Sequence, residues 1–287
     1  MTQTLFSELI DGIKSDKIIP CIGTVALQGS VHKETGAPIP ADSDSLILAM
    51  NNGEPMAKAL MYEFSRAAMN QELKHGRDYV NNFLTECYGK EVWTNTDIHQ
   101  WLAHIKPKYM IDINRDRLLQ DNYKGMPHNL IVGISRIKAV ANRFKIFNYD
   151  GNAYHEIEQE IVDLSLPTLF KPMGAVIPEP YYVASDADYV DYLTELRGGF
   201  GVPKCIKEYR KGKQYLFIGM HFSHDTERMV LGEMIYDAAD PIKGWILLKE
   251  PTRKEKRFCE RMGIEIVDAD LDDLLKAANW PITKKSY

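Results

Sequence analysis

His221 and His224 are the side chains whose type and spacing first suggest chemistry. They stand three residues apart in MHFSHDTER, and Asp225 follows the second, so imidazole and carboxylate ligands could meet at a metal ion here. The chain has no obvious third ligand and no C-x-x-C pair, so we expect no metal site. The segment also joins a predicted strand to a predicted helix, and Ser223 or Asp225 could simply cap that helix.

Asn114 and Asp116 form a second candidate in DINRDRLLQ, directly after a predicted strand. An amide at this place could bind a ribose or orient a water molecule. Asn114 could instead be a turn residue that caps the following helix, which carries Leu118 and Leu119. The spacing alone favours capping.

Met173 stands where a catalytic side chain could stand. In PTLFKPMGAV (167–176) an apolar run breaks off at Pro172 and turns through Gly174, as buried strands of α/β proteins do. Ligands gather outside the carboxyl ends of such strands. A thioether cannot transfer a proton, but it is polarisable and adaptable, so it can fill space in a packed interior.

The residues after the first predicted strand bear on phosphate binding. Gly23 allows a tight turn, and backbone amides there could face a phosphate. A dinucleotide fingerprint of the form G-x-G-x-x-G would need a glycine where Val25 stands, and a β-branched side chain would obstruct the pyrophosphate. The later GGFG (198–201) follows a predicted helix rather than a strand, so we interpret it as a loop.

Seven short apolar runs are the predicted strands that position these residues. Most of them lack the polar–apolar alternation of a half-exposed strand, which is typical of strands covered on both faces. Their alternation with helical patterns predicts an α/β fold with a doubly wound, mostly parallel, Rossmann-like sheet in a single domain over residues 1–287. The runs cover 18–23, 109–113, 144–148, 168–171, 215–219, 245–248 and 264–267.

The interval between the first two strands is about ninety residues, too long for one crossover helix. We expect a helical insertion over residues 44–105, packed against the sheet. Segments 78–88 and 94–105 have helical patterns, and Asn95 or Thr96 could cap the latter. An earlier helix is predicted from an apolar face at a helical period, behind a proline suited to a first turn: Pro55, Met56, Leu60, Phe64 and Ala67.

The overall composition is that of a globular chain, with 45% hydrophobic and 26% charged residues. A formal net charge of -5 argues against nucleic-acid affinity based on phosphate neutralisation, and we interpret TRKEKRFCER (252–261) as the solvated face of a helix. No apolar run is long enough to span a membrane, and acidic residues occupy the N-terminal segment where a signal peptide would be apolar. We therefore expect a cytoplasmic protein without nucleic-acid or membrane partners. Its four cysteines should be reduced, and its tail (281–287) should be frayed.

Five segments, taken in order, resemble the bacterial sirtuin-like domain, a broad family that includes NAD-consuming defence proteins. DINRDRLLQ is similar to the family's T-T-N-Y-D-R-L-L-E, and TLFKPMGAV to its strand that ends in Lys-Leu-His-Gly-Ser. The resemblance covers about residues 17–236. The matching segments are IPCIGTV, IHQWLAHIKPKYMIDINRDRLLQ, TLFKPMGAV, DADYVDYL and YLFIGMHFSHDTER.

The resemblance implies a Rossmann-like fold and a ligand of the NAD or ADP-ribose type. Asn114 and Asp116 match the family's Asn and Asp, whereas Ile113 and Arg115 replace their Thr and Tyr neighbours. The paired C-x-x-C zinc ribbon of the protein deacylases is missing, so any enzyme activity would be NAD hydrolase-like rather than deacylase-like. The implied cofactor-binding residues are Gly23, Thr24, Asn114, Asp116, Gly174 and Gly219.

Departures from the family's pattern fall on the residues that would carry its chemistry. By this resemblance Met173 occupies the place of the family's catalytic histidine, and Val25 and Leu27 replace a glycine and a serine of the phosphate turn. Met220 and His221 stand where small hydroxyl residues would contact the nucleotide. The pattern indicates that the scaffold is kept and the NAD chemistry is lost.

Three functions remain as competing hypotheses. The first is a catalytically degenerate sirtuin-like protein that acts by binding a nucleotide-type ligand or a protein partner. The second is an active NAD-cleaving enzyme with a relocated base, in which His221 or His224 takes the proton and Asn114 holds the ribose. The third is a structural subunit whose insertion (44–105) forms an interface in a homo-oligomer.

Overall fold

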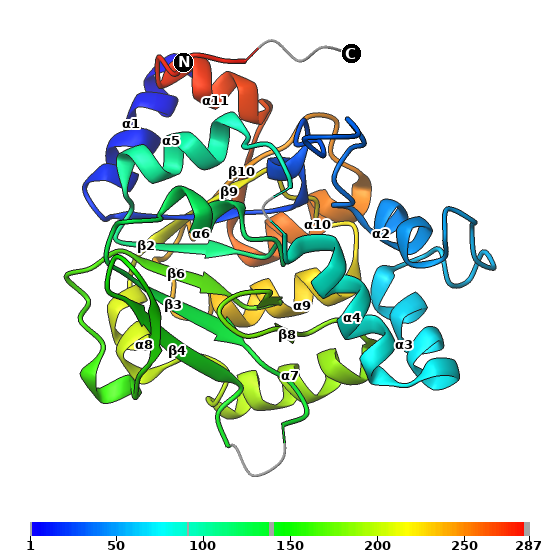
Figure 1. Ribbon diagram of the computed structural model, residues 1–287. Coiled ribbons are helices and arrows are strands. Elements are labelled where there is room, and N and C mark those ends of the chain that lie inside the picture. Colours follow the sequence, from blue (N-terminus) through cyan, green and yellow to red (C-terminus); the bar gives the residue numbers. More distant parts are fainter. Residues whose placement is uncertain (1, 91, 138–140, 284–287) are drawn as a thin grey trace.

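The computed structural model of the chain describes residues 2–90, 92–137 and 141–283. Within them a nine-stranded sheet runs in the order β11-β10-β9-β1-β2-β6-β3-β4-β5, and a two-stranded sheet pairs β7 (Gly174–Ala175) with β8 (Tyr181–Tyr182) (Figure 1). The strands of the large sheet are β1 (Ile18–Ile22), β2 (Tyr109–Asp112), β3 (His128–Gly133), β4 (Phe144–Tyr149), β5 (Tyr154–Glu156), β6 (Thr168–Lys171), β9 (Gln214–Ile218), β10 (Gly244–Leu247) and β11 (Ile264–Val267).

The pairing of these strands makes the large sheet mostly parallel. β1 lies between β9 and β2 and runs parallel to both, and β6 runs parallel to β2 and β3. β4 and β5 continue the sheet beyond β3 in antiparallel fashion. The predicted α/β class with a mostly parallel Rossmann-like sheet is confirmed, and the seven predicted strands lie within one residue of the observed bounds. β3 and the short strands β5, β7 and β8 are absent from the prediction.

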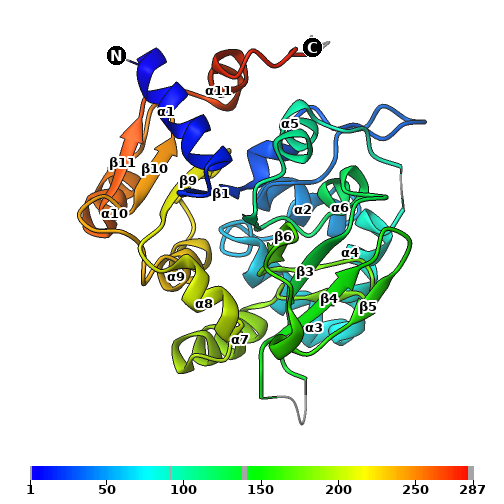
Figure 2. The same cartoon turned by 90° about the vertical axis from the view of Figure 1, so that its left-hand side faces the viewer.

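Helices cover both faces of the large sheet, so it is doubly wound. Alternate residues of β1 divide between the two faces, since Cys21 packs in one hydrophobic core and Ile22 in the other. The Ile22 face is covered by α1 (Thr2–Lys14), α5 (Asp97–Ile105), α6 (Leu118–Asn122) and α11 (Leu271–Ala277). The Cys21 face (Figure 2) is covered by α7 (Asp186–Gly198), α8 (Lys204–Arg210), α9 (Asp225–Met234) and α10 (Arg253–Met262), with the 3-10 helix η2 (Gln159–Ile161) beside α8.

A third hydrophobic core lies in the segment between β1 and β2. It is formed by α2 (Ser43–Met50), α3 (Phe64–His75) and α4 (Arg77–Tyr88), which lie together on the right-hand side of Figure 1. These three helices are called the insertion helices below. Val176 and Tyr182, from the β7–β8 segment, pack into the same core and connect it to the sheet.

The start of α3 differs from the sequence prediction. Pro55 and Met56 lie in an irregular segment, and the helix begins only at Phe64. Two turns occupy the chain between α2 and α3: Gly53 has a φ of 87° and donates its N–H to Leu48 O at 2.7 Å, and Leu60 donates its N–H to Ala57 O at 2.7 Å. The second turn falls inside the predicted apolar stripe, so only its last residues, Phe64 and Ala67, are helical.

The first turn of α5 is anchored to the loop after β1. Thr96, one of the two residues predicted to cap this helix, occupies the N-cap position, but its hydroxyl donates to Ala26 O at 2.9 Å and makes no capping bond to an α5 amide. The same hydroxyl lies 2.6 Å from His99 Nδ1. His99 is fully buried, and burial lowers the pKa of its imidazole, so the neutral ring is favoured.

Other expectations from composition can be compared with the structure. The cysteines at 21, 87, 205 and 259 are free, and the segment 252–261 falls in α10 with its basic side chains exposed. Among the described helices, none combines the length and apolarity that crossing a membrane requires. Residues 284–287, most of the tail predicted to be frayed, lie outside the described residues.

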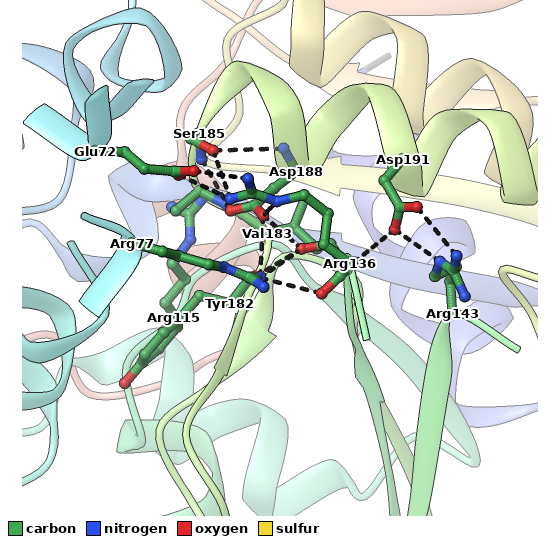
Figure 3. A network of polar contacts seen from close by, with 12 residues as sticks. Glu72, Arg77, Arg115, Arg136, Arg143, Tyr182, Val183, Ser185, Asp188 and Asp191 are labelled. Carbon is green, nitrogen blue, oxygen red and sulfur yellow. Dashed lines mark hydrogen bonds and ion pairs between the residues drawn. The ribbon is translucent and has the colours of Figure 1, made fainter. Parts of the chain in front are cut away.

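A network of charged side chains joins the insertion helices to α7 (Figure 3). Arg136, in the loop after β3, donates its two terminal nitrogens to the Glu72 carboxylate at 2.6 and 2.7 Å and its Nε to Asp188 Oδ1 at 2.7 Å. Arg77 Nη2 lies 3.0 Å from the same Asp188 oxygen. Glu72, Arg77, Arg136 and Asp188 are called the insertion clamp below, because they tie α3 and α4 to α7.

Asp188 is the shared acceptor of this clamp. Burial acts to raise the pKa of its carboxyl group, but Arg77, the Ser135 hydroxyl and the Ala184 amide outweigh burial and the pKa is lowered. Its Oδ2 also accepts the N–H groups of Ala184 and Ser185 at 3.1 Å, which completes the capping box of α7. The folded state therefore holds this carboxylate in its ionised form.

Asp188→Ala is expected to lower the free energy of unfolding by about 2 to 4 kcal/mol, because it removes the buried carboxylate that Arg77 and Arg136 share and also removes a helix cap. Urea unfolding followed by circular dichroism measures the change. The matched control is Asp78→Ala, an exposed acid on α4, which should change the same quantity by less than about 0.5 kcal/mol. Equal losses in the two variants would contradict the role assigned to the clamp.

Candidate functional site

A cavity of about 50 Å³ lies at the carboxyl ends of the central strands. It forms where the strand order reverses at β1, the place at which doubly wound sheets bind ligands. One wall consists of residues that follow β1, β2, β6 and β9, namely Thr24, Asn114, Arg115, Met173 and His224. The other consists of residues of the insertion segment, namely Leu46, Glu63, Phe64, Ser65 and Tyr88.

Buried polar contacts hold the strand ends below this cavity together. Lys171, the last residue of β6, donates a hydrogen bond from Nζ to Asp112 Oδ2 at the end of β2, and both side chains are fully buried. Asp112 Oδ1 accepts two bonds from Asn114, from the backbone N–H and from Nδ2, each at 2.9 Å. Asn114 Nδ2 also donates to Gly23 O at 3.0 Å. The four residues, called the strand-end knot below, connect β1, β2 and β6.

The charges of the strand-end knot depend on each other. Burial raises the pKa of the Asp112 carboxyl group, and the Lys171 ammonium opposes that rise. An isolated charge at such a place would cost several kcal/mol of desolvation, so each partner is tolerable only with the other present. The knot is therefore a structural device that leaves neither charge free to act on a ligand.

Asn114 has a different structural role from the predicted cap of α6. The bond to the first amides of α6 comes from Asp116, whose Oδ1 accepts the Leu118 N–H at 2.7 Å. Asn114 instead reaches across to β1, because its amide is held by Asp112 and Gly23. Asn114 lines the cavity, whereas Asp116 is fully buried and does not, and among the described residues its Oδ2 has no hydrogen-bond partner.

The turn after β1 is packed against the turn after β9. Residues Thr24–Leu27 form the 3-10 helix η1, and Val25 donates its N–H to Gly219 O at 2.9 Å. A Cβ added to Gly23 would lie 2.5 Å from Met220 Cγ, and one added to Gly219 would lie 2.9 Å from the Ala26 amide nitrogen. Gly23 and Gly219 are thus required for close approach of two backbones, and Thr24 is the residue of η1 that lines the cavity.

Met173 lines the cavity with only 3% of its surface exposed. It belongs to the hydrophobic core that contains Ile113, Val183 and Met220. The following Gly174 has a φ of 95° and pairs with Tyr182 in the β7–β8 hairpin, so its conformation serves that hairpin. Met173 and Met220, which the sequence analysis places at the ligand site, do come together, but as packed apolar side chains of one hydrophobic core, and of the two Met173 lines the cavity.

The two histidines have different surroundings. His224 lines the cavity from the N-cap position of α9, whereas the His221 side chain is 54% exposed and faces Glu255 Oε1 at 3.5 Å. Neither Ser223 nor Asp225 is the N-cap of α9. That position is held by His224, whose side chain makes no capping bond, and Asp225 pairs with Arg228. In the described part of the chain, no group of three or more His, Cys, Asp or Glu side chains could hold a metal ion.

Two carboxylates that the sequence analysis missed also line the cavity. Glu63 is almost fully buried and accepts bonds from the backbone N–H and hydroxyl of Thr226, so a residue of the insertion segment caps α9. Glu227 faces the same cavity, and burial, followed by the nearby Glu63 charge, raises the pKa of Glu227 to about 7. Glu227 could have been noticed one helical turn beyond His224, but no local signal distinguishes Glu63.

Comparison with protein families gives one match. Residues 108–267, from the start of β2 to the end of β11, match the SIR2-like domain family. The chain belongs to this SIR2-like domain family. No curated protein sequence matches the chain. The matched segment contains Asn114, Met173 and His224, but not the turn after β1 or the insertion helices.

The cavity of this SIR2-like domain has limited chemical capacity. Its volume of about 50 Å³ is enough for a few water molecules, whereas sites for ligands of drug or cofactor size measure about 300 to 1,000 Å³. Met173 transfers no proton, and the Asn114 amide is already bonded on its donor side. Burial raises the pKa of Glu227 to about 7, so this lining carboxyl group can exchange a proton near pH 7.

Lys171→Met in this SIR2-like domain is expected to lower the free energy of unfolding by about 3 to 5 kcal/mol, because it leaves the buried Asp112 carboxylate unpaired. Chemical denaturation measures this loss. Adding Asp112→Asn, which removes the charge but keeps an acceptor for Asn114, should recover part of it. Lys249→Met, which breaks an exposed pair with Asp270, is the control and should cost about 1 kcal/mol or less. A double variant no more stable than Lys171→Met would contradict the charge argument.

Glu227→Gln is expected to flatten the pH dependence of stability. The folded-state pKa of about 7 lies above the ordinary value of 4.5, so the folded protein binds this proton more tightly and loses stability as the pH rises through that interval. Between pH 5 and 8 the wild type should lose about 1 to 3 kcal/mol more than the variant. Urea titrations at both pH values measure the difference, with Glu233→Gln on the same helix as the control. Parallel pH profiles for Glu227→Gln and wild type would refute the assignment.

Proposed function

We propose that this SIR2-like protein acts by binding, as a catalytically degenerate member of its family, and that its ligand is nucleotide-like or a protein partner. The observation that carries the proposal is the position of Met173, which is packed into the core at the turn where the family resemblance places a catalytic histidine. Loss of a general base typically removes a factor of about 10² to 10⁴ in rate, and a thioether offers no substitute.

The size and charge of the cavity support binding by rearrangement rather than by direct entry. A dinucleotide of the NAD or ADP-ribose type does not fit in about 50 Å³, so such a ligand requires the insertion helices to move away from the strand ends. Arg115 is the one arginine or lysine among the cavity-lining residues that the structure describes, and Glu63 and Glu227 lie beside it. A pyrophosphate would therefore meet little positive charge there.

An active NAD-cleaving enzyme with a relocated base is the second candidate. The observation that favours it is the pair formed by Glu227, with a pKa of about 7, and His224, since both line the cavity next to Asn114. His221 is less suited to the role because its side chain points to solvent and Glu255. Between the two histidines, this candidate therefore selects His224.

A structural role for the insertion helices is the third candidate. Large apolar side chains are exposed on or beside α3 and α4, namely Tyr62, Leu73 and Tyr79. An interface in a homo-oligomer, or with another protein, would cover them. Light scattering of the chain with and without Leu73→Ser would distinguish this role, because a mass that falls in the variant would support it.

The proposal predicts no nicotinamide release from the wild-type protein, and calorimetry with NAD and with ADP-ribose measures whether either ligand binds. Turnover that is abolished by Asn114→Ala would overturn it. Turnover lost in His224→Ala or Glu227→Gln but kept in His221→Ala would establish the second candidate. His221→Ala is the matched control, because it removes an imidazole of the same segment that does not line the cavity.

A further inference from the structure

A second depression in the surface lies between α9 and α10, outside the cavity, and its volume is about 450 Å³. The two helices pack on the same face of the sheet (Figure 2). It is called the α9–α10 groove below. Its cationic lining residues are Arg228, Arg253, Lys254, Arg257 and Arg261.

The sequence of α10 explains why three of these cations lie on one side of that helix. Arg253, Arg257 and Arg261 follow each other at intervals of four residues, so they form a row with a rise of about 6 Å between neighbours. The helix turns its apolar residues Phe258 and Cys259 into the core. The amphipathic pattern of α10 therefore places the three arginines on its exposed side, while its apolar side packs against the sheet.

The positive charge of the groove is poorly neutralised within the molecule. Asp225 is the one carboxylate among the lining residues, and it already pairs with Arg228 and lies 3.5 Å from Lys254 Nζ. Glu255, on the first turn of α10, is buried and accepts the N–H and hydroxyl of Thr252 in a capping box. Five cations therefore face one carboxylate, in a chain whose formal net charge is -5.

The arginines of the row are available to a ligand. No ion pair of Arg253 or Arg257 with another described residue is observed, and Arg261 lies over the Phe258 ring at 5.6 Å. All three side chains are exposed. Guanidinium groups form paired hydrogen bonds with phosphate oxygens, and several of them at one groove favour a ligand with more than one phosphate.

We propose that the α9–α10 groove binds a compact phosphate-bearing ligand of the size of a nucleoside di- or triphosphate. The volume of about 450 Å³ lies within the range of small-molecule sites, about 300 to 1,000 Å³. The row of three arginines is about 12 Å long, which spans a polyphosphate but offers no extended track for a nucleic-acid backbone. This site is separate from the cavity and does not depend on the function proposed for it.

Calorimetry on the full chain tests the proposal, with tripolyphosphate and ATP as probes and adenosine as the phosphate-free comparison. We expect both phosphates to bind and adenosine not to bind. Arg253→Gln combined with Arg257→Gln should weaken binding about tenfold or more, and the affinity of the wild type should fall between about 50 and 200 mM salt. Arg257→Lys, which keeps the charge but loses the planar fork, should weaken binding less than the double variant.

Two control variants separate binding in the α9–α10 groove from binding elsewhere on the molecule. Lys256→Gln removes a cation from the same helix outside the groove, and Asn114→Ala alters the cavity, so neither should change the affinity for tripolyphosphate. Failure of both phosphates to bind, or unchanged affinity in the double arginine variant, would overturn the proposal. Tighter binding of a single-stranded oligonucleotide than of ATP through the same arginines would also overturn it, in favour of a nucleic-acid surface.

Discussion

The buried carboxylate of Asp112 is the point on which the centre of the molecule depends. It accepts bonds from Lys171 at the end of β6 and from Asn114 after β2, and Asn114 in turn holds the carbonyl of Gly23 after β1. These strands would be adjacent without it, because their apolar faces already pack on both sides. The knot fixes how the ends of these strands are aligned, and it therefore helps to position the cavity residues that follow them, such as Thr24, Asn114 and Met173. The same bonds occupy the polar groups that a ligand would otherwise use.

The insertion clamp acts at the opposite side of the cavity. The knot fixes the sheet, and the clamp ties α3 and α4 to α7, so the cavity lies between two parts that are each anchored by buried charge. Glu63 adds a third connection, since it belongs to the insertion segment but caps α9. A ligand larger than a few water molecules can enter only if some of these contacts break, and their energies then set the affinity that can be observed.

Most of the architecture could be predicted from the sequence, because buried parallel strands leave continuous apolar runs that need no partner to be recognised. β3, β5, β7 and β8 are the exceptions. β5, β7 and β8 are only two or three residues long and leave no pattern, whereas β3 carries the apolar run LIVGI (130–134) and could have been recognised. The site was less predictable. Local spacing favours a capping role for Asn114 over a ribose or water contact, but its partner Gly23 is 91 residues away and no local pattern indicates that bond. Glu63 joins the cavity through a tertiary contact alone, and nothing in its local sequence indicates that contact.

The first turn of α9 belongs to both surfaces. Asp225 and Arg228 face the α9–α10 groove, while Thr226 and Glu227 face the cavity. A ligand in the groove and a ligand in the cavity would therefore contact the same turn of α9. By thermodynamic linkage, the factor by which an occupant of the groove alters affinity at the strand ends equals the factor in the reverse direction. Helix α9 would then couple the two sites, so that a ligand bound at one of them changes the affinity of the other.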